Sequence, residues 1–111
     1  MPPRTIFQVL AEAARQYGDT PALHQPTGGD SRYQIYSWRE FHQAAEEIAA
    51  GLYRTGIRKG DVVALASETR AELYLADLGI MALGAISAAL YTSYPVAEQV
   101  RTLRDCDAQA V

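Results

Sequence analysis

The sequence predicts an α/β fold that begins a doubly wound, mostly parallel sheet. Three apolar runs have the length of short buried strands, namely Val62–Ala66, Ile86–Leu90 and Ala108–Val111. Two helical stretches, Glu72–Leu83 and Pro95–Asp105, separate these runs. Continuous apolar strands that alternate with helices indicate a parallel sheet with helices on its faces. We therefore expect the three strands to lie parallel in one sheet, with the two helices as crossovers.

A peripheral helix and a β-hairpin are predicted before this sheet. Thr5 and Gln8 have the spacing of a capping box, which predicts a helix that begins there and ends at Gly18. The runs 22–24 and 32–36 read as two strands joined by a turn-rich connection, which favours a hairpin. The expected apolar face of the first helix consists of Ile6, Leu10, Ala13, Ala14 and Tyr17.

The best-marked helix of the sequence begins at Ser37. Glu40 completes a capping box with this serine, and Gly56 ends the helix. Ile57 is expected to fold back on that end. One apolar stripe, which we expect to be core, consists of Trp38, Phe41, Ala45, Ile48 and Leu52.

The two crossover helices have weaker boundary signals. Thr69 and Glu72 again have capping-box spacing, and Gly84 closes the first crossover. Pro95 suits the first position of the second crossover. Its expected buried face consists of Val96, Val100 and Leu103.

Composition excludes several classes of protein. The net charge is −3 and the ten Lys and Arg residues are scattered, whereas nucleic-acid binding needs a clustered basic face. The single cysteine, Cys106, allows no internal disulfide, which favours a reducing, cytoplasmic setting. No apolar run reaches the ~20 residues of a membrane span.

The sequence holds none of the common reaction-centre motifs. GxxxxGK[ST], GxSxG and CxxC are all missing, and the connection Ala66–Arg70 has no glycine. It therefore offers no GxGxxG cradle for a pyrophosphate. We predict no catalytic, cofactor-binding or metal-binding residue within residues 1–111.

Four single residues have both a functional and an ordinary interpretation. His24 or His42 could act as a base, but neither has a marked partner, so we favour surface or hydrogen-bonded roles. Cys106 could be a reactive thiol, but the adjacent carboxylates disfavour a thiolate and a half-buried bystander is the better interpretation. Asp77 interrupts an apolar run, either as a buried partner for a basic group or, as we favour, on a solvent-facing strip.

Three tyrosines allow a similar choice. The three rings could line a ligand-binding site, but the helical positions of these tyrosines favour packing at the edges of the core. These residues are Tyr17, Tyr53 and Tyr74.

Four segments, in this order, resemble a known family. They are Tyr36–Phe41, Ala49–Leu52, Gly56–Ala64 and Gly79–Ala85. They are similar to the first two core motifs, and their surroundings, of the adenylate-forming acyl-CoA synthetases, also called AMP-binding enzymes. The resemblance runs from Thr5 to the end of the chain, and both motifs are structural.

Other segments point to one branch of that family. Ser67–Arg70, Tyr91–Val100 and Leu103–Ala108 most resemble long-chain fatty acyl-CoA synthetases. Adenylation domains of peptide synthetases typically have a proline and an aspartate after the second motif, and Ala88–Thr92 has neither.

The resemblance implies a two-step ligase that uses ATP, Mg²⁺ and coenzyme A to convert a fatty acid into its thioester. It further implies that residues 1–111 are the N-terminal part of a larger adenylate-forming domain, cut at Val111. The phosphate loop and the other reaction-centre motifs would then follow Val111, and the fragment alone would be inactive. Peripheral membrane contact and a homo-oligomer are also expected. Two alternatives stay open: an enzyme that activates amino or aryl acids, and a free-standing binding or dimerisation module.

Overall fold

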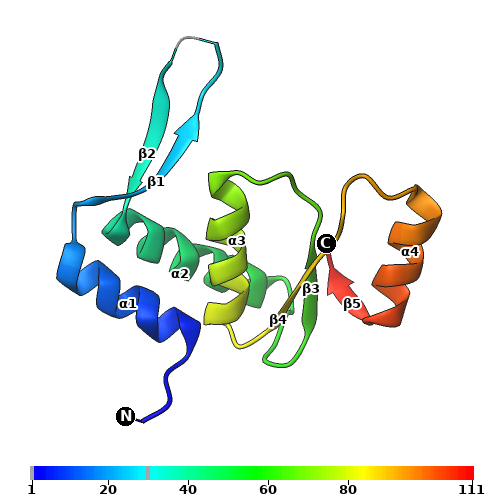
Figure 1. Cartoon of the computed structure of the whole chain (residues 1–111). Helices are drawn as coiled ribbons and strands as arrows, with labels where there is room; N and C mark the ends of the chain where they lie inside the picture. Colours follow the sequence, from blue (N-terminus) through cyan, green and yellow to red (C-terminus); the bar gives the residue numbers. More distant parts are fainter. Residues whose placement is uncertain (1, 30) are drawn as a thin grey trace.

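The computed structural model describes residues 2–29 and 31–111. Four helices and five strands lie within these residues (Figure 1). In chain order they are α1 Ile6–Tyr17, β1 Pro21–Pro26, β2 Tyr33–Ser37, α2 Trp38–Arg54, β3 Val62–Leu65, α3 Ala71–Ala82, β4 Ile86–Ala89, α4 Val96–Asp105 and β5 Ala108–Ala110.

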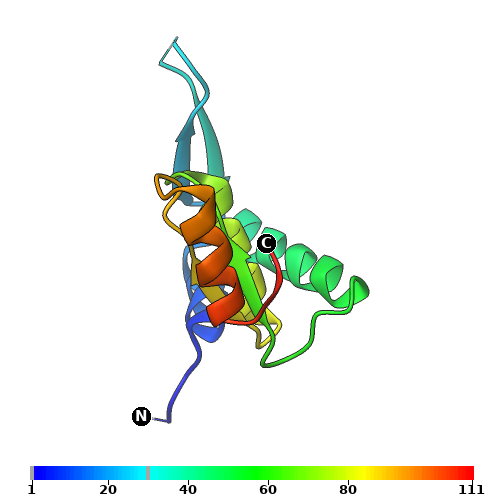
Figure 2. The ribbon, with the colours of Figure 1, turned by 90° about the vertical axis from the view of Figure 1, so that its right-hand side faces the viewer.

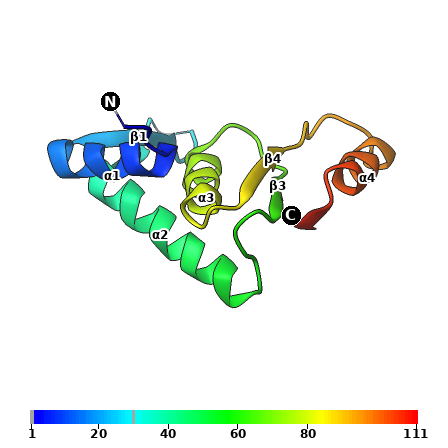
Figure 3. The ribbon, with the colours of Figure 1, turned by 90° about the horizontal axis from the view of Figure 1, so that it is seen from below.

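The parallel sheet is confirmed. Its order is β4-β3-β5, and β3 pairs in parallel with both neighbours. Val62 lies opposite both Ile86 and Ala108. Helices α1, α2 and α3 lie on one side of these strands and α4 on the other (Figure 3). The α/β architecture with crossover helices is therefore the one that the sequence predicts.

The predicted hairpin is confirmed as well. β1 and β2 pair antiparallel, with an irregularity between Pro21 and Leu23. The hairpin projects away from the rest of the chain, so it is peripheral (Figures 1 and 2).

Helix α3 joins two small hydrophobic cores. The first core consists of Leu10, Phe41, Ala45 and Leu75, and the second of Ile57, Val63, Ile80 and Ala85. Because α3 contributes to both, it has to be apolar around most of its circumference. The stripe predicted on α2 is core: Phe41 and Ala45 are buried, and its other three residues pack against these clusters. The face predicted for α1 is only partly buried, since Ile6 and Tyr17 are largely exposed.

Two of the three predicted capping boxes are present. Thr5 and Gln8 cap α1, and Ser37 and Glu40 cap α2, with side-chain and backbone hydrogen bonds in both directions. The two backbone amides between Ser37 and Glu40 also have partners. Trp38 N donates to Thr20 O, and Arg39 N donates to Gly18 O. The four N–H groups that a helix start normally leaves unpaired are thus all bonded in α2.

Two glycines end helices in the same manner. Gly56 has a φ of +104° and Gly84 of +81°, a conformation that side chains rarely adopt. Each is followed by an apolar residue whose amide reaches back into the helix: Ile57 N donates to Leu52 O and Ala85 N to Ile80 O, both in Schellman geometry. Both of these apolar residues then enter the second core.

The predicted cap of α3 is wrong. The N-cap is Arg70 and not Thr69, and the side chain of this residue accepts no hydrogen bond from a backbone amide of the helix. The Glu72 carboxylate binds the Arg70 guanidinium instead, at 2.7 and 3.1 Å. This hydrogen bond, with the attraction between the charges, lowers the pKa of Glu72 and raises the pKa of Arg70. The first amide of the helix, Ala71 N, is bonded by Gln25 from the hairpin.

The buried face predicted for α4 is also wrong. None of residues 96–105 is buried, and Val96 is 76% exposed. The helix packs against β5, and α4 with β5 forms the outer end of the molecule (Figure 1). Pro95 is the N-cap rather than the first helical residue, because its ψ of 153° is extended. Within the described residues no helix is both long and apolar enough to cross a bilayer.

Candidate functional site

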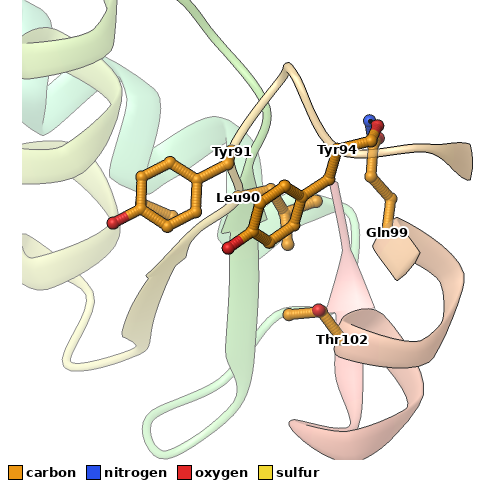
Figure 4. Close-up of a pocket in the computed structure, with 6 residues that line it drawn as sticks. Leu90, Tyr91, Tyr94, Gln99 and Thr102 are labelled. Atoms are coloured by element: carbon orange, nitrogen blue, oxygen red, sulfur yellow. Dashed lines mark hydrogen bonds between the residues drawn. The ribbon is translucent and has the colours of Figure 1, made fainter.

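A small pocket lies beyond the carboxyl end of β4. Ligands of open parallel sheets bind at this edge, so it is the first place to look for a site. The pocket has a volume of about 170 Å³ and is formed by the end of β4, the following loop and α4 (Figure 4). Its lining consists of Ala89, Leu90, Tyr91, Tyr94, Gln99 and Thr102.

Backbone hydrogen bonds hold the loop that forms this pocket. Leu90 N donates to Leu65 O at 2.8 Å, which extends the pairing of β4 with β3 by one residue. Tyr94 N then donates to Tyr91 O and closes a turn. Gln99 Nε2 donates to Tyr94 O at 2.8 Å and ties the loop to the first part of α4. The two tyrosine rings consequently lie together, with centroids 5.1 Å apart and planes at 48°.

The pocket is neutral and amphipathic. It offers aromatic faces, two phenol groups and an amide, while the Thr102 hydroxyl is already bonded to Glu98 O. No Lys or Arg is among its lining residues, so a phosphate would find no counter-charge there. Complete small-molecule sites usually occupy about 300–1,000 Å³. This pocket therefore fits one uncharged, partly apolar portion of a ligand rather than a whole nucleotide.

The other connection at this edge of the sheet is no better suited to phosphate. It runs from Ala66 to Arg70, and its arginine is paired with Glu72. The Ala71 amide, which would face an anion at the start of α3, is bonded to Gln25. Within the described residues no group of three or more His, Cys, Asp or Glu side chains could hold a metal ion.

The single residues considered from the sequence lie apart from this pocket. His24 is exposed and meets the Tyr33 ring edge-on, and His42 stacks on Phe7 and pairs with Glu46 at 3.2 Å. Both have the surface or hydrogen-bonded roles that we favoured. Cys106 is half-buried, with its thiol 3.6 Å from Leu103 O, as expected of a bystander.

Two further sequence hypotheses concern Asp77 and the tyrosines. Asp77 is half-buried on α3, which does not support the hypothesis of a buried charge. Tyr17, Tyr53 and Tyr74 form no common site, and each is more than two-fifths exposed. Tyr17 lies against Trp38, and the Arg58 guanidinium lies 3.8 Å from the centre of the Tyr53 ring.

The pocket tyrosines were not identified from the sequence as site residues. Tyr91 and Tyr94 stood out only as an aromatic connector. Their position directly after an apolar strand of a parallel sheet is the signal that could have found them.

The second of the two family motifs, Gly79–Ala85, has a structural role, as expected. Gly79 lies where α3 crosses α2, and a methyl group on it would come within 2.5 Å of Ile48 Cγ2. Only glycine allows the two helices to approach this closely.

Comparison with known proteins identifies the family. The fold is that of the N-terminal subdomain of adenylate-forming enzymes. The N-terminal subdomain of NpsA from Klebsiella oxytoca superposes with a TM-score of 0.84 over 98% of this chain and 27% of the other, at 23% identity. Residues 10–111 match the family model described as AMP-binding enzyme. The chain belongs to the AMP-binding enzyme family.

Individual relatives differ in what their names say they act on. An uncharacterised Mycobacterium tuberculosis protein, Rv1549, is 34% identical over 93% of this chain and 56% of its own length. 4-Coumarate–CoA ligase 3 of Arabidopsis thaliana is 30% identical over 90% of this chain and 17% of its own. Long-chain-fatty-acid–CoA ligase ACSBG2 of Xenopus laevis is 24% identical over the whole chain and 15% of its own length. The chain thus spans about half of the first relative and under a fifth of the two ligases.

Proposed function

We propose that the chain is the N-terminal portion of an ATP-dependent acyl-CoA ligase that acts on long-chain fatty acids. The observation behind this proposal is the family match over residues 10–111. In the proposed reaction a carboxylate attacks ATP to give an acyl-adenylate and pyrophosphate. Coenzyme A then displaces AMP to give the thioester. Mg²⁺ would offset the charge of the phosphates during the first step.

The long-chain substrate is supported by local sequence. The segment Tyr91–Val100 resembles the long-chain branch, and the run Ala88–Thr92 lacks the proline and aspartate typical of peptide synthetases. The relation to ACSBG2 over the whole chain agrees with this branch.

The role of these 111 residues would be architectural. The residues that the structure describes supply three parallel strands, their covering helices and the neutral pocket after β4, and none of them forms a cradle for phosphate. Adenylate formation needs a phosphate cradle, a metal and an acyl pocket that converge on one point. Further sequence would have to supply them.

An aryl acid is the second candidate substrate. 4-Coumarate–CoA ligase 3 has the higher identity of the two ligases, at 30%. The neutral aromatic pocket suits the flat, partly polar part of a ligand equally well.

Expression of the complete natural reading frame that contains this chain tests both proposals. Its product would be incubated with ATP, Mg²⁺ and coenzyme A, with palmitate, 4-coumarate or an amino acid as the substrate. We expect palmitate-dependent release of pyrophosphate and formation of palmitoyl-CoA. Turnover of 4-coumarate alone would favour the aryl-acid ligase. A reading frame that stops at Val111, with no carboxylate-dependent pyrophosphate release, would contradict the ligase and favour a free-standing module.

A further inference from the structure

The connections that follow β3 and β4 leave the sheet toward opposite faces. The two strands are neighbours, and Leu90 N donates to Leu65 O where they end. The chain continues from β3 into α3 on one side of the strands and from β4 into α4 on the other (Figure 3). Neighbouring parallel strands whose connections diverge in this way form the crevice in which open α/β sheets bind ligands. Residues 66–70 are therefore one wall of that crevice, and the turn at Tyr91 and Tyr94 is the other.

The side-chain bonds that residues 66–70 make among themselves and with the start of α3 are local. Ser67 Oγ donates to Glu68 O at 2.8 Å, and the Arg70 guanidinium binds the Glu72 carboxylate. Each of these bonds joins residues one or two positions apart in the chain. They therefore do not fix this wall relative to the rest of the molecule.

The hairpin supplies a contact that does fix the wall. Oε1 of Gln25 accepts a hydrogen bond at 2.6 Å from the amide of Ala71, the residue directly after the wall. The side-chain amide of Gln25 is itself oriented, because its Nε2 donates to Pro26 O at 3.2 Å. The hairpin projects from the same end of the molecule as the two connections (Figure 1). Residues 23–26 of the hairpin and 69–71 of the chain also share the walls of one pocket.

We propose that Gln25 is a positioning residue of the ligase, which holds residues 66–70 in place as a wall of the ligand crevice. The inference rests on the proposed function, and in it Gln25 acts through the amide of Ala71 rather than by touching a substrate. One end of the wall continues from β3, whose last residue, Leu65, is bonded to Leu90. Gln25 fixes the other end. Loss of that bond frees one end, and a shift of about 1 Å in a substrate-positioning group already costs much of an enzyme's activity.

The first measurement does not depend on catalysis. The protein encoded by the complete natural reading frame is compared with its variants by hydrogen–deuterium exchange of the peptide that spans residues 66–72. Gln25→Ala should speed the exchange of the Ala71 amide by about tenfold or more, because this buried group loses its partner. Gln34→Ala, on the opposite strand of the hairpin, is the matched control and should leave the exchange unchanged.

The second measurement separates positioning from stability. A variant that is merely less stable contains fewer folded molecules, so its maximal rate falls while the KM values for fatty acid, ATP and coenzyme A stay the same. We expect Gln25→Ala to raise the KM of the substrate that contacts the wall by about tenfold and to leave the others unchanged. Ser37→Ala, which removes the cap of α2, is the matched control and should keep all three KM values.

Two conservative variants test the geometry of the bond. Gln25→Glu keeps an oxygen at the same reach, so it should retain most of the natural exchange behaviour and KM values. Gln25→Asn keeps the amide group but shortens the side chain by one methylene. It should therefore behave like Gln25→Ala, although its polarity is that of the natural residue.

Four outcomes would overturn the proposal. Unchanged exchange of residues 66–72 in Gln25→Ala would show that the bond does not hold the wall. Faster exchange with three natural KM values would make Gln25 a structural residue only, and the same KM change in Ser37→Ala would trace the effect to stability. A natural protein without ligase activity would overturn the proposed function and this role with it. That failure is distinguishable from the others, because it appears in the natural protein and not only in its variants.

Discussion

Oε1 of Gln25 accepts a hydrogen bond from the backbone amide of Ala71, 46 residues further along the chain, at 2.6 Å. This contact ties the projecting hairpin to the start of α3, which has no cap from its own sequence. Ala71 is 5% exposed, so water can barely replace the lost partner if the glutamine is removed. The hairpin is therefore not only an appendage, because it completes the N-terminus of the helix that joins the two cores.

Gln25→Ala should destabilise the chain by about 1–2 kcal/mol, since it leaves a buried amide unpaired. Gln25→Glu keeps an acceptor and should retain most of the stability. Gln34→Ala is the matched control, because Gln34 is the exposed cross-strand neighbour of Gln25. Urea denaturation of the three variants measures the differences. An equal loss in Gln25→Ala and Gln34→Ala would mean that the bond to Ala71 contributes nothing.

Gly79→Ala should destabilise the chain, although alanine is the better helix former by about 1 kcal/mol. The added methyl would lie 2.5 Å from Ile48 Cγ2 and 3.2 Å from Ala45 O, so the two helices would have to separate. Overpacking of this kind costs about 1–3 kcal/mol.

Gly51→Ala is the control for Gly79→Ala. Nothing lies within 4 Å of the position of its new methyl group, and Gly51 is exposed inside α2. This variant should stabilise the chain by up to about 1 kcal/mol. Thermal or urea denaturation that ranks Gly79→Ala above Gly51→Ala in stability would show that α2 and α3 do not pack as closely as described.

Helix α2 offers a comparison of a cap with a core residue. Ser37→Ala removes the side-chain bond to Glu40 N and should cost about 1 kcal/mol. Leu52→Ala should cost more, about 2 kcal/mol, because this half-buried side chain packs against the second core. The same denaturation assay compares them. A smaller loss for Leu52→Ala than for Ser37→Ala would place the lower part of the stripe outside the core.

Local chemistry made most of the fold predictable, and distant contacts account for what was missed. The capping boxes at Thr5 and Ser37 and the glycine ends at Gly56 and Gly84 depend on neighbours in sequence, so the pattern alone identifies them. Thr69 has the same spacing but does not cap α3. The first amide of that helix, on Ala71, is bonded instead by Gln25, which lies 46 residues earlier in the chain.

The exposed face of α4 also depends on contacts outside its own sequence. Period and polarity predict that Val96 and Val100 are buried, but they do not say whether any element is present to cover them. The pocket is different, because its residues are close in sequence: the turn at Tyr91 and Tyr94 meets the start of α4, and its place after the apolar strand β4 is the signal that could have found it.

The pairing of Arg70 with Glu72 predicts a titration that can be measured. The hydrogen bond from Arg70 lowers the pKa of the Glu72 carboxyl. Any stability from this pair is therefore fully present above the pKa that Glu72 has in the unfolded chain. It is lost as the pH falls through the lower pKa that Glu72 has in the folded chain. Because both groups are solvent-exposed, we expect a small effect that salt weakens further.

Carbon-detected NMR of the Glu72 carboxyl tests this assignment directly. Arg70→Gln should raise the pKa of Glu72 toward the ordinary value of a glutamate. Arg101→Gln removes a cation on another helix and should leave the Glu72 titration unchanged. Identical titration curves for the natural chain and Arg70→Gln would mean that the pair does not form in solution.

Residues 1–111 alone should bind Mg²⁺-ATP no better than any small acidic protein does. Phosphates are commonly held by the free amides at a helix N-terminus. The first amides of α2 are bonded to Thr20, Gly18 and the capping serine, and that of Ala71 is bonded to Gln25. α4 begins after Pro95, which has no amide hydrogen, and the pocket beside it is lined by no basic residue.

Isothermal titration of the chain with ATP and Mg²⁺ measures this directly, and we expect no saturable heat. Tyr94→Ala, which removes a wall of the pocket, is the companion variant and should give the same featureless titration. Micromolar, magnesium-dependent binding that Tyr94→Ala abolishes would make the pocket at the end of β4 a nucleotide site. Such a result would contradict the purely architectural role proposed for these residues.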